Sequence, residues 1–131
     1  MTQEEKNLFL RDLCARLPYG VIGHYYLNKS LEWGNPEKLI DIDLIKGRLL
    51  TEENDYCIEE FILYLRPMDS MTDEERRDFY DNLRPKYDGK PWESLGGDID
   101  WLNAHHFDYR DLIRQGLAIE VTPENNPYEN R

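Results

Sequence analysis

Residues 39–51 read LIDIDLIKGRLLT, and they show the clearest strand pattern in the chain. Ile40, Ile42 and Leu44 alternate with two aspartates, which predicts a strand that buries its apolar face and leaves its acidic face in water. A Lys-Gly pair then turns the chain into residues 48–51, the expected hairpin partner. The stretch therefore predicts an antiparallel sheet.

A helix precedes this hairpin. Thr2 and Glu5 have the spacing of a capping box, and apolar residues then recur at helical intervals until Pro18 ends the run. Beyond that proline the apolar period changes to the alternation that is typical of strands. We therefore expect a helix over 1–17 and a β-rich region over 19–66.

The second half of the chain begins with an ambiguous segment. The apolar residues of 56–66 match both a helical and a strand period, and we expect a short helical turn followed by a strand. Thr72 and Glu75 form a second capping-box pattern that opens a helix to about Leu83. An irregular connection follows, and we expect Trp92 to fold it back onto the core.

The last part of the chain predicts short helices and one strand. Asp98 can cap a helix through His106, and Asp108 with Asp111 can cap another. The expected organisation is one domain with a helix at 1–17, a β-rich region at 19–66, a helical region with a last strand at 72–121, and a solvated tail at 122–131. The fold class is α+β: a small antiparallel, SH3-like sheet or barrel, flanked by the N-terminal helix and by C-terminal helices with a closing strand.

The chain is acidic, with 16 Lys and Arg against 27 Asp and Glu among 131 residues and a net charge of −11. Such a charge disfavours binding to phosphate backbones and to anionic lipid. There is no signal-peptide pattern and no apolar run near the roughly 18 residues of a membrane-spanning helix. We expect a cytoplasmic protein that binds neither nucleic acid nor membranes directly, with Cys14 and Cys57 reduced and buried.

Histidine is the commonest metal ligand, and His105 and His106 lie close to Asp108. Adjacent helical residues point about 100° apart, however, so the two imidazoles are poorly placed to bind one ion. We therefore expect no metal, and we expect one imidazole to pack beside Trp101 and the other to bond a backbone carbonyl oxygen. No hydrolase or nucleotide motif occurs, so we expect no catalytic residue and no cofactor. A small metal-dependent enzyme built on these histidines and nearby acids is the alternative.

Three stretches carry a resemblance to a known group of proteins: LRDLCARLPYGV at 10–21, YLRPMDSMTDEE at 64–75 and DWLNAHHFDYRDLIRQGLAIE at 100–120. There the chain resembles a group of small uncharacterised proteins encoded by Bacteroides and their phages or prophages. It departs from the group at Asp111, where glycine is common, and its middle is more individual. The resemblance implies a phage or mobile-element origin and a bacterial cytoplasmic setting. It implies no activity, cofactor or site residue.

The leading hypothesis is a small acidic accessory protein without enzymatic activity, which binds a host or phage protein. Exposed aromatic residues dominate interface hot spots, and two strand acids could take part in mimicry of nucleic acid, together with the acids of 69–81. A structural oligomer or virion component is a further alternative. The candidate interaction residues are Trp33, Tyr87, Trp92, Tyr109, Asp41 and Asp43.

Overall fold

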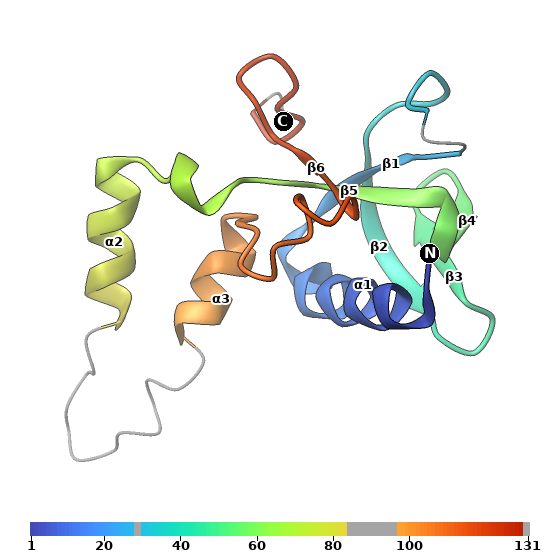
Figure 1. The fold of residues 1–131 in the computed structure, drawn as a ribbon, viewed down its shortest axis with the longest axis horizontal. Coiled ribbons are helices and arrows are strands. Elements are labelled where there is room, and N and C mark those ends of the chain that lie inside the picture. The colour runs from blue at the N-terminus through green and yellow to red at the C-terminus, as the bar shows by residue number, and fades with distance from the viewer. Residues whose placement is uncertain (28–29, 84–96, 130–131) are drawn as a thin grey trace.

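The computed structural model describes residues 1–27, 30–83 and 97–129, and it shows an α+β fold built on one open sheet (Figure 1). The helices are α1 (Gln3–Arg16), α2 (Asp73–Leu83) and α3 (Gly97–Ala104). The strands are β1 (Ile22–Tyr25), β2 (Glu37–Asp43), β3 (Arg48–Thr51), β4 (Asp55–Cys57), β5 (Phe61–Leu65) and β6 (Ala118–Glu120). Short 3-10 turns lie at Leu17–Tyr19, Ile58–Glu60 and Met68–Ser70.

The sheet has the strand order β4-β3-β2-β1-β5-β6. Every pair is antiparallel except β5 and β6, which run parallel. A parallel neighbour needs a long crossover, and the segment with α2 and α3 supplies it. The α+β class, the N-terminal helix and the closing strand are therefore confirmed, whereas the sheet is mixed and open and does not close into a barrel.

The core lies between α1 and one face of the sheet (Figure 1). The Thr2–Glu5 capping box forms both of its bonds, at 2.9 and 3.1 Å. The buried side of α1 carries two charged residues beside its apolar ones, while Cys14 is exposed and Cys57 is half-buried. The prediction of two buried cysteines is therefore wrong. The core cluster comprises Phe9, Leu13, Val21, Leu39, Leu49, Phe61, Leu63, Leu65, Leu112, Leu117 and Ala118.

The predicted hairpin is confirmed, but the faces of β2 differ from the prediction. The register of β2 against β3 shifts between Leu39 and Asp41, which is a β-bulge. Leu39 and Ile42 contact the core, while Ile40 is 49% exposed. The bulge adds one residue to the strand, so the expected alternation of Ile40, Ile42 and Leu44 on one buried face does not hold.

The ambiguous segment 56–66 resolves as predicted, with a 3-10 turn at Ile58–Glu60 followed by strand β5. The sequence did not predict strand β4 just before it.

On β1, Gly23 allows close approach to β5, since a Cβ atom there would lie 2.4 Å from the Phe61 ring and 2.7 Å from the Ile62 carbonyl oxygen.

The second capping box is confirmed at Thr72 and Glu75, with bonds of 3.0 and 3.1 Å. Helix α3 begins at Gly97, so Asp98 lies in its first turn and not at its cap. It ends at Ala104, before His106, whose positive φ of 65° is outside the helical region. The segment expected to fold back around Trp92 lies outside the described residues.

The helix predicted from Asp108 and Asp111 is absent from the described residues, where 108–116 forms successive turns. Asp111 has a φ of 61°, which a right-handed helix excludes. The prediction of a solvated tail is also wrong at Tyr128, because the Tyr128 hydroxyl group bonds the backbone of β1 and β5. The segment 121–129 therefore loops back far enough for Tyr128 to contact the sheet.

Candidate functional site

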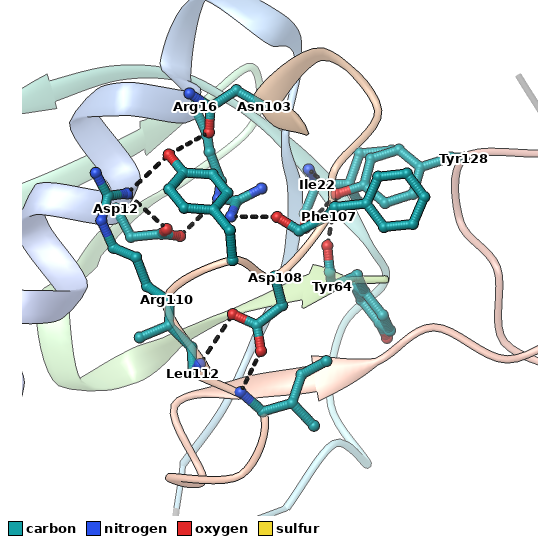
Figure 2. A network of polar contacts seen from close by, with 12 residues as sticks. Asp12, Arg16, Ile22, Tyr64, Asn103, Phe107, Asp108, Arg110, Leu112 and Tyr128 are labelled. Carbon is teal, nitrogen blue, oxygen red and sulfur yellow. Dashed lines mark hydrogen bonds and ion pairs between the residues drawn. The ribbon is translucent and has the colours of Figure 1, made fainter. Parts of the chain in front are cut away.

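A buried ion-pair network joins α1 to the segment after α3 (Figure 2). The Asp12 carboxylate accepts a bond of 2.7 Å from Arg16 Nε and one of 3.0 Å from Arg110 Nη1. Arg16 also donates from Nη2 to the Phe107 carbonyl oxygen at 2.6 Å. Asp12 and Arg16 are both 0% exposed, so each relies on the other for charge compensation.

Tyr109, a predicted interaction residue, belongs to this network. Its hydroxyl group donates to Asn103 Oδ1 at 2.8 Å and accepts from Arg110 Nη1 at 3.0 Å. Its ring lies 5.1 Å from the Arg16 guanidinium carbon and 4.8 Å from that of Arg110. These contacts stabilise the packing of α1 against the 103–110 segment, so Tyr109 is not a free anchor for a partner.

The sequence carries a signal for this network that was not among the expected site residues. Asp12 and Arg16 are four residues apart and share the buried face of α1 with Phe9 and Leu13. An acid and a base at this spacing face each other on a helix, and their place on its apolar face indicates that the pair is buried.

The metal candidates have separate partners. The Asp108 carboxylate accepts from the backbone N–H groups of Leu112 and Ile113, at 2.8 and 2.9 Å. His105 stacks on Trp101 with ring centroids 4.0 Å apart, as predicted for one imidazole. Among residues 1–27, 30–83 and 97–129, no group of three His, Cys, Asp or Glu side chains could hold a metal ion.

His106 faces a different neighbour from His105. Its ring stacks on Tyr128 with centroids 3.8 Å apart and an interplanar angle of 10°. Burial, together with the positive charges of Arg16 and Arg66, lowers the pKa of His106 to about 4. The ring is therefore neutral at pH 7.

A second ion pair holds α2 against the end of β5. Arg66 donates from Nη1 and Nη2 to the two oxygens of Glu75, at 2.7 and 2.6 Å. These bonds lower the pKa of Glu75 to about 2, although its partial burial opposes the shift. The Arg66 guanidinium carbon lies 4.1 Å from the centroid of the Phe107 ring, so the pair also covers the aromatic core residue.

The main exposed feature is a run of hydrophobic side chains. Six of the ten large hydrophobic side chains that are exposed among the described residues lie between positions 27 and 45. Trp33 is 69% exposed and Ile45 is 98% exposed. We call this run the exposed hydrophobic segment, and it comprises Leu27, Leu31, Trp33, Ile40, Leu44 and Ile45. The run extends past both ends of β2, with Leu27, Leu31 and Trp33 before the strand and Leu44 and Ile45 after it.

The two strand acids have unequal roles beside this segment. The Asp41 side chain is exposed and bonds only the neighbouring backbone N–H of Ile42, at 2.8 Å. Asp43 accepts from the backbone N–H groups of Ile45 and Lys46, both at 3.1 Å. Asp43 therefore shapes the turn on which Ile45 is exposed, and Asp41 is the acid available to a partner.

A hollow of about 440 Å³ opens beside the loop of Trp33. It is lined by residues 34–38, 52–54 and Tyr56. Three glutamates and one lysine are among them, so the lining carries a charge of 1 − 3 = −2. The exposed tryptophan therefore has an acidic neighbourhood.

Glu37 is the most strongly bonded acid of this hollow. Its carboxylate accepts from Thr51 Oγ1 at 2.8 Å, from Asn54 Nδ2 at 2.9 Å and from the Tyr56 hydroxyl group. Burial raises the pKa of Glu37, but these three hydrogen bonds outweigh it and the pKa lies below the ordinary value. Glu37 is thus ionised at neutral pH and adds a fixed negative charge.

Tyr87 and Trp92, the other two predicted interaction residues, lie outside the described residues. No protein-family model, curated protein sequence or solved structure matches the chain. No helix of the described residues has the length and apolar character needed to cross a membrane.

Proposed function

We propose that this chain is a small acidic binding protein without enzymatic activity, which attaches to a protein partner through the exposed hydrophobic segment. The observation that carries the proposal is the exposure of Trp33, at 69%, within a run of six exposed hydrophobic side chains. Tryptophan is enriched among residues that contribute most to binding energy. The phage or mobile-element origin and the cytoplasmic setting implied by the resemblance form part of this proposal, and so does the likeness of strands β1–β5 to an SH3 sheet.

Charge defines the kind of partner. The chain carries a net charge of −11, and the hollow beside Trp33 is acidic. A partner must therefore present positive side chains around an apolar contact, because like charges facing each other oppose association. We infer a protein whose surface is basic, such as one that otherwise binds nucleic acid, and this keeps mimicry of nucleic acid within the proposal.

Affinity capture from a Bacteroides lysate, with and without phage infection, tests this proposal. The bait is the tagged protein, compared with Trp33→Ser and with Tyr80→Ser as the matched control, because Tyr80 is also exposed, at 61%, but lies on α2. We expect a stoichiometric basic protein that is captured by the wild type and by the Tyr80 variant and is lost with the Trp33 variant.

Three other outcomes contradict the proposal. Equal capture by both variants places the contact away from Trp33. Capture of only a second copy, with a dimer or larger species by light scattering, supports the structural-oligomer alternative. A stoichiometric metal in the bait, lost with His105→Ala, supports the enzyme alternative.

A further inference from the structure

The central strand pair of the sheet is interrupted at one position. β1 pairs with β5 antiparallel, with Gly23 opposite Leu63 and His24 opposite Ile62. Bonded pairs alternate along such a ladder, and the Tyr26 N–H donates to the Glu60 carbonyl oxygen at 2.7 Å. Going back along β1 from Tyr26, the same alternation predicts a bonded pair of His24 with Ile62 and then one of Ile22 with Tyr64.

The Tyr128 hydroxyl group occupies this last position (Figure 2). It accepts from the Ile22 N–H at 3.0 Å and donates to the Tyr64 carbonyl oxygen at 2.7 Å. One hydroxyl group thus replaces the direct bond between the two strands, and it satisfies a donor and an acceptor that would otherwise be buried without partners. Burial raises the pKa of Tyr128, so the hydroxyl group keeps the proton that it donates.

The rest of the tyrosine ring has a built environment. The His106 ring stacks on it, with centroids 3.8 Å apart and planes 10° from parallel. His106 is itself held by backbone bonds, because its carbonyl oxygen accepts from the Arg66 N–H at 2.8 Å. His106 Nδ1 is buried and has no hydrogen-bond partner, so the ring contacts Tyr128 by stacking and not through this nitrogen.

We propose that the gap between β1 and β5 is a binding slot for a phenol side chain, formed by the Ile22 N–H, the Tyr64 carbonyl group and the His106 ring. In the structure the chain fills the slot with its own Tyr128, which straps the C-terminal segment to the sheet. The ligand class is tyrosine or a simple phenol, because the slot needs an aromatic ring and a hydroxyl group that donates and accepts at once. The slot is independent of the exposed hydrophobic segment and of the proposed function.

Removing only the hydroxyl group tests the hydrogen-bonding half of the slot. The measurement is amide hydrogen exchange by NMR in the full chain, comparing wild type with Tyr128→Phe. We expect the protection of the Ile22 amide to fall about tenfold or more, since it loses its acceptor. The Tyr26 amide, which bonds across the same strands without Tyr128, is the internal control and should keep its protection. Unchanged protection at Ile22 overturns the proposal.

Chemical rescue tests the ligand class. Tyr128→Ala leaves an unfilled slot, and p-cresol, which is the tyrosine side chain alone, is the probe. We expect millimolar p-cresol to restore protection at Ile22 and to raise the melting temperature of this variant, with toluene giving less and the wild type unaffected. Equal effects of p-cresol and toluene, or equal effects on wild type and variant, overturn the assignment of a phenol slot. If Tyr128→Ala does not fold, the protection of the Ile22 amide in Tyr128→Phe still tests the hydrogen-bonding half of the slot, and unchanged protection there overturns the proposal.

Discussion

The Asp12→Ala substitution is expected to destabilise the fold strongly. Both members of the Asp12–Arg16 pair are 0% exposed, so the substitution leaves a buried guanidinium charge without its counter-charge. Breaking a buried pair in this way costs about 3–5 kcal/mol. The whole free energy of unfolding of a domain is about 5–15 kcal/mol, so the variant should be marginally folded at 25 °C.

Urea denaturation at pH 7 measures this loss, and two variants serve as controls. Arg110→Ala removes the more exposed donor, whose side chain is 22% exposed, and should cost only about 1 kcal/mol. The double variant Asp12→Leu/Arg16→Met removes both charges together, so it should lose less than Asp12→Ala alone, although the Phe107 carbonyl oxygen loses a donor. A cost of under about 1 kcal/mol for Asp12→Ala, or a double variant less stable than the single one, would mean that the buried Arg16 charge does not depend on Asp12.

Four further substitutions or titrations follow from the structure. Gly23→Ala should cost about 1–3 kcal/mol of unfolding free energy by denaturation, because its Cβ would meet the Phe61 ring and a backbone oxygen. Asp111→Gly should raise the melting temperature slightly, since the φ of 61° strains any residue with a Cβ, although the Asp111 ion pair with Arg114 is lost. Because its pKa is lowered from 4.5 to about 2, ionised Glu75 stabilises the fold above pH 4.5, and this contribution is lost as the pH falls towards 2. In Glu75→Gln the free energy of unfolding should therefore depend less on pH between 4.5 and 2. The buried His106 ring is neutral, so its contribution to the free energy of unfolding is complete above pH 6.5 and is lost as the pH falls from 6.5 to about 4. NMR titration of the ring should give a midpoint near 4.

Each of these four predictions would be contradicted by a specific result. A stable Gly23→Ala variant would mean that β1 and β5 separate easily, and a destabilised Asp111→Gly variant would mean that the ion pair outweighs the strain. Unchanged acid denaturation in Glu75→Gln would remove the Arg66–Glu75 pair as a source of acid stability. A His106 midpoint near 6.5 would mean that its ring is exposed in solution.

Local signals were the predictable part of this fold. The capping boxes at Thr2 and Thr72 and the hairpin turn at Gly47 depend on residues within a few positions of one another, and the structure confirms all three. The positive φ of Asp111 is local too, and it favours glycine at that position.

Non-local pairing decided the rest. The bulge that exposes Ile40 depends on the register of β2 against β3, which alternation along one strand does not show. Asp12 and Arg16 are buried because each compensates the other, whereas a charged residue taken singly predicts exposure. Tyr128 lies in a polar stretch, and its docking depends on a gap between two strands that lie 64 and 106 positions away in the sequence.

The site was predictable in part for the same reasons. Trp33 was predicted as an interaction residue, and it is exposed. Tyr109 was predicted as one too, but its contacts lie within the buried network. The acidic hollow beside Trp33 combines residues from three separate segments, so no single stretch of sequence predicts it.

The most direct test of the proposed function is the salt dependence of partner capture by wild type, Trp33→Ser and Tyr80→Ser. At about 0.1 M salt we expect equal capture by wild type and Tyr80→Ser and at least tenfold less by Trp33→Ser, because a hot-spot tryptophan contributes about 2 kcal/mol or more. At about 0.5 M salt capture by the wild type should fall, since exposed charge pairs are screened. Capture that Trp33→Ser does not reduce would contradict the proposed contact, and capture that about 0.5 M salt does not weaken would contradict a basic partner.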